Sequence, residues 1–194
     1  MRANRYVMAL AAVLASPSAF AGSGPAGSFG GYVTMTDADF DDGTGFGIKG
    51  WASVNGPWFV HGEYQTVGFE TPGGVDVDLN ELRFGGGLTG DLQQNAKWLA
   101  KAEYIDFGSD FDQSGFGFHG GAMFDATPAL TLFGTLGLLF TDDTDGLEVN
   151  FGGKYGFSKD WSGFLDYRAY SGDVDGGGTF DLTDIRIGAM FNFY

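Results

Sequence analysis

The chain has 194 residues, 35 glycines, an aromatic content of 16% and no cysteine, which excludes disulfides, zinc–thiolate sites and a thiol nucleophile. Its formal net charge of −15 argues against nucleic-acid binding, because a phosphate backbone would repel such a chain. The glycine and aromatic content favours an all-β fold with tight turns.

Residues 1–21 have the features of a secretory signal peptide. Two arginines precede a short apolar run, and Ala19-Phe20-Ala21 has the small-x-small form of a cleavage site. The run is much shorter than the roughly 20 residues that a membrane-spanning helix needs. We therefore predict cleavage after Ala21 and an exported domain formed by residues 22–194.

Ten segments of alternating apolar and polar residues follow, each close to the roughly 9–11 residues of a tilted membrane-spanning strand. Because side chains alternate across a strand, one face of each is apolar and the other mostly polar. We predict a single antiparallel up-and-down transmembrane β-barrel of ten strands, with eight strands as the alternative. The ten segments are residues 28–36, 44–54, 58–67, 79–89, 97–106, 115–124, 130–141, 147–157, 161–170 and 183–193.

The connections between these segments are of two kinds. Those after odd-numbered strands are acid-rich, such as DADFDDG at 37–43 and DDTDG at 142–146. Those after even-numbered strands are mostly short turns, such as NGP at 55–57 and SKD at 158–160. The domain is therefore expected to have two chemically different ends, with both of its termini at the short-turn end.

Alternation alone does not fix the direction of the apolar faces. They would point inward in a soluble β-sandwich and outward in a barrel surrounded by lipid. The export signal, the unlike ends and the aromatic last strand favour the barrel, in which the last strand pairs with the first and no edge is exposed. A soluble exported β-protein is the alternative fold.

Twelve charged side chains, six basic and six acidic, lie on the polar faces and are predicted to form a lumenal charge network. An interior of about ten strands is only slightly wider than that of eight-stranded barrels, which side chains fill. Because an unpaired charge in a narrow lumen is costly, the equal numbers favour a structural network that plugs the barrel. The twelve are Lys49, Glu63, Glu81, Arg83, Lys101, Glu103, Glu148, Lys154, Asp166, Arg168, Asp184 and Arg186.

Neighbouring strands suggest the partners within this network. Glu81 is expected to pair with Lys101. Asp166 is expected to pair with Arg186 or Arg168. A narrow passive channel for small cations or solutes is the alternative to a plugged lumen, whereas an open porin would need a wider barrel of about 16 strands.

The two histidines, His61 and His119, also lie on the polar faces. His119 with Glu103 is a candidate acid–base pair for an outer-membrane enzyme. The sequence has no nucleophile elbow and no His-Glu-x-x-His motif to accompany such a pair. We therefore expect hydrogen-bonded core histidines and no catalytic residue.

The acidic connections hold the candidate cation ligands. DADFDDG resembles the start of an EF-hand loop, but Asp42 replaces the required glycine and Ile48 the final glutamate. Weak binding of Ca²⁺ or Mg²⁺ would bridge the loops to lipid phosphates, and the simpler interpretation is that the loops repel one another and stay hydrated. We expect no other cofactor. The candidates are Asp37, Asp39, Asp41, Asp42, Asp142, Asp143 and Asp145.

The last strand is similar to the C-terminal assembly signal of bacterial outer-membrane barrels. Arg186, Gly188, Phe191 and Phe193 fit the pattern polar-x-Gly-x-x-aromatic-x-aromatic, and Tyr194 stands one residue beyond it. The resemblance implies an outer-membrane location. It also implies the barrel-assembly machinery, membrane lipids and lipopolysaccharide as partners.

Residues 22–194 also resemble the small OmpA/OmpX-type and opacity-type barrels. The stretches LNELRFGGGLTGDL, LAKAEYIDF and GKYGFSKDWSGFLDYRAY are more similar to a xanthomonad group of small barrels once linked to quorum sensing and virulence. Neither resemblance implies a catalytic residue. We predict a plugged barrel with acidic surface loops and a structural or surface-interaction role. The sequence does not indicate its oligomeric state.

Overall fold

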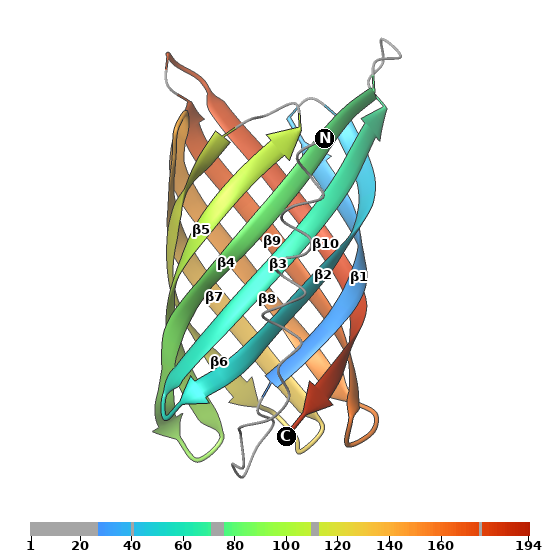
Figure 1. The fold of residues 1–194 in the computed structure, drawn as a ribbon, viewed down its shortest axis with the longest axis vertical. Coiled ribbons are helices and arrows are strands. Elements are labelled where there is room, and N and C mark those ends of the chain that lie inside the picture. Colours follow the sequence, from blue (N-terminus) through green and yellow to red (C-terminus); the bar gives the residue numbers. More distant parts are fainter. Residues whose placement is uncertain (1–26, 40, 71–75, 110–112, 175) are drawn as a thin grey trace.

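The computed structural model describes residues 27–39, 41–70, 76–109, 113–174 and 176–194, so the predicted signal peptide lies outside the described residues. Ten antiparallel strands account for most of this part of the chain (Figure 1). They are β1 (Gly27–Ala38), β2 (Asp41–Asn55), β3 (Trp58–Glu70), β4 (Asp76–Gln93), β5 (Ala96–Ser109), β6 (Gln113–Asp125), β7 (Leu130–Thr141), β8 (Thr144–Gly156), β9 (Trp161–Val174) and β10 (Thr179–Phe193).

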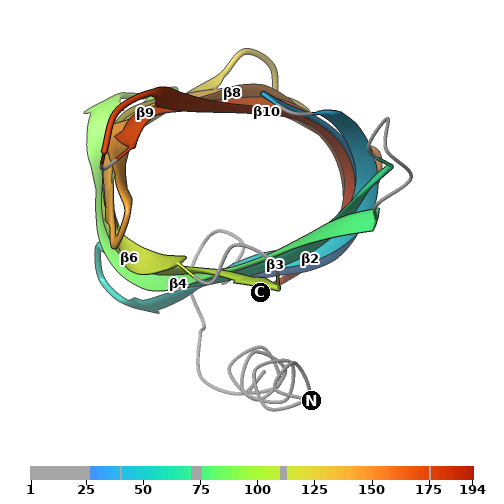
Figure 2. The same cartoon turned by 90° about the horizontal axis from the view of Figure 1, so that it is seen from above.

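The strands form one closed up-and-down barrel. Each strand pairs with its neighbours in sequence, and β1 pairs with β10 from Gly27 opposite Phe193 to Ala38 opposite Leu182. The strands tilt across the barrel wall in Figure 1 and close into a ring in Figure 2. The predicted ten-stranded fold and its closure by the last strand are confirmed. Within the described ranges, no helix is long and apolar enough to cross a membrane.

The strands are 12 to 18 residues long and extend beyond the predicted segments, mainly at the acid-rich end. Only residues 39–40 separate β1 from β2, and only residues 142–143 separate β7 from β8. The prediction of longer acidic loops is therefore wrong at these two hairpins. Their aspartates were assigned to loops from composition, but Asp37, Asp41, Asp42 and Asp145 lie within paired strands, where alternate side chains can point to solvent.

The outer face is apolar around the barrel. Leu136 is 57% exposed there, and Phe118 packs edge to face against Phe140 with 6.3 Å between the ring centroids, a separation usual for aromatic pairs. An exposed apolar surface of this extent would aggregate in water and is stable against lipid. The predicted outward direction of the apolar faces is confirmed. Further exposed members are Phe46, Ile48, Phe84, Phe116, Leu132, Leu138, Leu147, Val149, Phe151, Leu165, Ile185 and Ile187.

The lumen is filled in layers along the barrel axis. Nearest the acid-rich end is an apolar layer, which we define as Ala38, Val67, Phe69, Leu79, Ile105, Leu139, Tyr170 and Leu182. The buried charged residues follow toward the short-turn end, most of them on the same strands. Closer still to that end, Tyr32, Phe164 and Met190 form a smaller cluster. The sequence analysis did not predict the apolar layer, whose side chains interrupt the polar faces of their strands.

Candidate functional site

The lumen brings together eleven of the twelve predicted charges in a network of ion pairs, which we call the charge network. Lys154 lies outside it, near the short-turn end of β8. There it faces Thr131 on β7, whose hydroxyl donates to Asp125 at 2.7 Å. The network therefore contains six acids but five bases.

One part of the charge network is centred on Arg186. Its Nη1 donates to Glu63 at 2.8 Å and its Nε to Asp166 at 2.5 Å, so the predicted pair of Asp166 with Arg186 is formed. Lys49 donates to the other oxygen of Asp166 at 2.6 Å. Tyr32 adds a hydrogen bond to Glu63 at 2.5 Å. Two cations thus balance two carboxylates in this part.

A second part reaches across the barrel. Arg168 on β9 binds Glu81 on β4 through two parallel hydrogen bonds of 3.0 and 2.5 Å. Four strands separate β9 from β4 in either direction around the ring, so this pair joins opposite walls. Arg168 also donates to Asp184 at 2.7 Å. All three side chains are buried.

The predicted pair of Glu81 with Lys101 is not the one formed. Glu81 binds Arg83, with Nε at 2.6 Å, in addition to Arg168. Lys101 donates instead to Glu103 on its own strand at 2.7 Å. The physical reason is reach: a guanidinium in a narrow lumen contacts carboxylates on several strands, so the partner need not lie on the adjacent strand.

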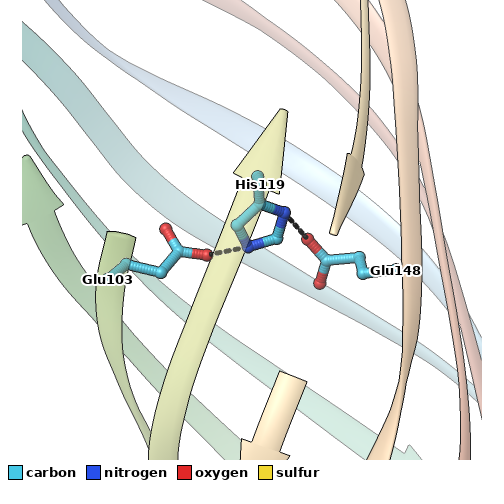
Figure 3. A group of neighbouring side chains, drawn as sticks. All are labelled: Glu103, His119 and Glu148. Atoms are coloured by element: carbon cyan, nitrogen blue, oxygen red, sulfur yellow. Dashed lines mark ion pairs between the residues drawn. The ribbon is translucent and has the colours of Figure 1, made fainter. Parts of the chain in front are cut away.

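The third part surrounds His119 on β6. Its Nε2 lies 2.9 Å from Glu103 Oε1, and its Nδ1 lies 3.8 Å from Glu148 Oε1. Figure 3 shows the imidazole between the two carboxylates, which come from β5 and β8. All three side chains are buried. Among the described residues, this trio is the one group of His, Asp and Glu that brings three ligand atoms within 4.8 Å of one another.

Two glycines make this arrangement possible. Gly137 on β7 lies between His119 and Glu148 in the strand register. A Cβ on Gly137 would lie 2.1 Å from His119 Nδ1, and one on Gly117 would lie 2.9 Å from Nε2. The ring therefore occupies space that any other residue at position 137 would fill. Nothing in the sequence indicates that Gly117 and Gly137 are needed to make room for the His119 ring.

Arg83 and Lys101 are the cations beside this trio. Arg83 Nη1 lies 3.0 Å from both Glu103 and Glu148, and its Nη2 donates to Glu148 at 2.6 Å. The second histidine, His61 on β3, approaches the other oxygen of Glu103 at 3.4 Å. The predicted proximity of His119 to Glu103 is thus present, at a buried position where both ring nitrogens face carboxylates.

The seven candidate cation ligands form two separate groups at the acid-rich end. Asp37, Asp39, Asp41 and Asp42 lie at the β1–β2 hairpin, and Asp142, Asp143 and Asp145 at the β7–β8 hairpin. The strands β9 and β10 separate the two hairpins. Asp39 accepts from the backbone N–H of Asp181 at 2.9 Å, and Asp142 from that of Ser114 at 3.1 Å. The structure does not bring the seven into one site.

The residues of the predicted assembly signal divide between the two faces of β10. Arg186 and Gly188 point into the lumen, where a Cβ on Gly188 would lie 2.3 Å from the Gly31 carbonyl oxygen. Phe191 faces outward and contacts Trp161 and Phe29, with ring centroids at 5.4 and 6.0 Å. Phe193 pairs in register with Gly27. The signal thus lies along the seam that closes the barrel.

Comparison with known proteins supports this fold. No family model and no curated protein matches the chain. Among solved structures, the NanC porin matches with a TM-score of 0.53 at 13% identity, covering 83% of this chain and 98% of the porin. Neisserial surface protein A matches at 0.50 and 15% identity, covering 87% of this chain and 97% of its own.

The translocator domain of the autotransporter NalP from Neisseria meningitidis also matches, with a TM-score of 0.50 at 11% identity, covering 98% of this chain and 96% of the domain. Identities this low establish a shared fold. The closer resemblance to xanthomonad small barrels finds no support in these comparisons. By its closed ten-stranded fold and its apolar outer face, the chain has the fold of small outer-membrane β-barrels.

Proposed function

We propose that this barrel is closed to solutes and has a structural or surface-interaction role in the outer membrane. The observation that carries the proposal is the two-point ion pair between Arg168 and Glu81, which joins opposite walls of the lumen. A hydrated ion moving along the axis would have to separate this pair. Separating a buried ion pair costs several kcal/mol, about 3–5 when one partner is lost.

The apolar layer supports the same proposal. Val67, Ile105 and Leu139 each have 0% exposure, so their side chains are packed against protein on every side. An apolar constriction excludes water and with it any hydrated ion. Because this layer lies between the charge network and the acid-rich end, a solute entering there meets an apolar barrier first and a charged one second.

The acid-rich end is the surface that we propose for contacts outside the cell. Short turns usually face the periplasm in outer-membrane barrels, which directs the acidic hairpins outward. Asp37 lies opposite Asp42, and Asp145 lies opposite Asp173, on exposed parts of paired strands. Like charges in direct register repel. Divalent cations shared with lipopolysaccharide phosphates would relieve that repulsion, so lipopolysaccharide is the proposed contact.

Single-channel recording of refolded residues 22–194 in a planar bilayer tests the closed lumen. We expect no steady conductance from the unsubstituted barrel. The double variant Glu81→Ala with Arg168→Ala removes the cross-lumen pair and should raise the frequency of conducting events. Lys154→Ala, outside the charge network, is the matched control.

The narrow cation channel is the alternative that this recording separates. A steady, cation-selective conductance of the unsubstituted barrel would overturn the closed lumen. If that conductance also fell when the exposed hairpin aspartates were changed to Asn, the acid-rich end would be the channel entrance. Heat-dependent mobility of the barrel in detergent gels would show that each variant is folded before it is recorded.

A further inference from the structure

The charge network carries one carboxylate more than its bases balance. The part centred on Arg186 is balanced, so the surplus lies in the rest of the lumen. There, when His61 and His119 are counted as neutral, three bases stand against four acids: Arg83, Lys101 and Arg168 against Glu81, Glu103, Glu148 and Asp184. A buried carboxylate without compensating charge is costly, so this half of the lumen favours an additional cation.

The imidazole of His119 marks the position for that cation. Its side chain has 0% exposure, and Nε2 contacts Glu103 Oε1 at 2.9 Å, whereas Nδ1 lies 3.8 Å from Glu148 Oε1 and makes no hydrogen bond among the described residues. Buried polar atoms are nearly always hydrogen-bonded, so the unbonded Nδ1 requires an explanation. Glu103 and Glu148 lie on either side of the ring (Figure 3).

We propose that Glu103, His119 and Glu148 bind a divalent transition-metal ion of the Zn²⁺ type inside the lumen. One imidazole nitrogen and two carboxylate oxygens form a ligand set that suits Zn²⁺. The three ligand atoms lie within 4.8 Å of one another. Bonds of about 2.0–2.2 Å in a tetrahedral site place the ligand atoms about 3.3–3.6 Å apart, so the three atoms need to shift by roughly 1 Å relative to one another.

Arg83 is the competitor for this site. Its Nη1 lies 3.0 Å from the same Oε1 atoms of Glu103 and Glu148 that face His119. Metal binding therefore requires the guanidinium to withdraw toward Glu81, which it already contacts at 2.6 Å. The metal and Arg83 neutralise the same two carboxylates, and removal of the guanidinium is expected to strengthen metal binding. Because the lumen is proposed to be closed to hydrated ions, the metal is expected to enter while the barrel folds.

Refolding of residues 22–194 in detergent at increasing Zn²⁺ concentrations, followed by removal of free metal and measurement of the zinc retained per barrel, tests the proposal. We expect saturable binding of one Zn²⁺ per barrel. His119→Gln and Glu148→Gln should each weaken binding at least tenfold, and Arg83→Gln should strengthen it. Lys154→Gln and the double variant Asp142→Asn with Asp143→Asn are controls that should bind as the unsubstituted barrel does.

Two results would overturn the proposal. One is the absence of saturable zinc binding by the unsubstituted barrel. The other is binding that His119→Gln leaves unchanged, particularly if the Asp142→Asn with Asp143→Asn variant loses it, because the metal would then lie at the acid-rich end. X-ray absorption at the zinc edge of the unsubstituted barrel needs no variant: imidazole scattering is expected, and a shell of oxygens alone would contradict the proposed ligands.

Discussion

The charge network and the acid-rich end use the same residue types in opposite ways. In the lumen, Asp184 is 0% exposed and Arg168 holds it at 2.7 Å. At the acid-rich end, Asp145 is exposed and lies opposite another exposed aspartate, Asp173. The difference teaches that burial decides what a carboxylate requires: in the lumen it needs a fixed cation, whereas at the rim water and mobile ions stabilise it.

Arg168→Leu is expected to cause the largest loss in the free energy of unfolding, because it removes a cation from the lumen. It leaves Asp184 buried without a cation and Glu81 with Arg83 alone, and the loss of one partner of a buried ion pair costs about 3–5 kcal/mol. Urea titration in lipid vesicles should show a fall of that size in the free energy of unfolding. Lys154→Leu, outside the charge network, is the control. A loss below about 1 kcal/mol would mean that the lumenal charges are as well solvated as those of the rim.

Leu136→Arg tests the outward direction of the apolar faces, on which the distinction between lumen and rim depends. Leu136 is 57% exposed on the outer face of β7, and an arginine near the bilayer midplane costs about 2–4 kcal/mol. The same urea titration measures the effect, with Leu136→Phe as an apolar control. Equal stability of the two variants would place this side chain away from lipid.

Gly137→Ala tests how tightly the side chains in the lumen are packed around His119. Its Cβ would lie 2.1 Å from His119 Nδ1, so the ring must move away from Glu148. Overpacking of this kind costs about 1–3 kcal/mol. Gly120→Ala is the matched control on the outer face, since nothing lies within 4 Å of a Cβ there. Equal free energies of unfolding for the two variants would show that the His119 ring has room to move.

Asp145→Asn is expected to have the smallest effect and the opposite sign. It removes repulsion with Asp173, so the barrel should become more stable by about 0.2–1 kcal/mol at low salt. The gain should vanish at about 1 M salt, where the screening length is about 3 Å. Unfolding at two salt concentrations measures this. A gain that high salt leaves intact would indicate a cause other than charge.

The period of two in the sequence was sufficient to predict the number of strands, their inner and outer faces and eleven members of the charge network, but it wrongly added Lys154. It could not predict partners across the lumen, because Arg168 and Glu81 lie on opposite walls and alternation carries no information about such contacts. The apolar layer did leave a signal. Val67, Leu79 and Leu139 interrupt the polar faces of their strands, each near an acid-rich connection.

Arg186 belongs both to the seam that closes the barrel and to the charge network. It lies on β10, the last strand, and it is the cation that Glu63 and Asp166 share. Until β10 has joined β1, Arg186 and Asp166 lie on one side of the open seam and Lys49 and Glu63 on the other, so Glu63 lacks Arg186 and Asp166 lacks Lys49. Completion of the wall and formation of these two ion pairs are therefore a single event in folding, and a barrel that fails to close lacks the charge contacts that hold the seam from inside.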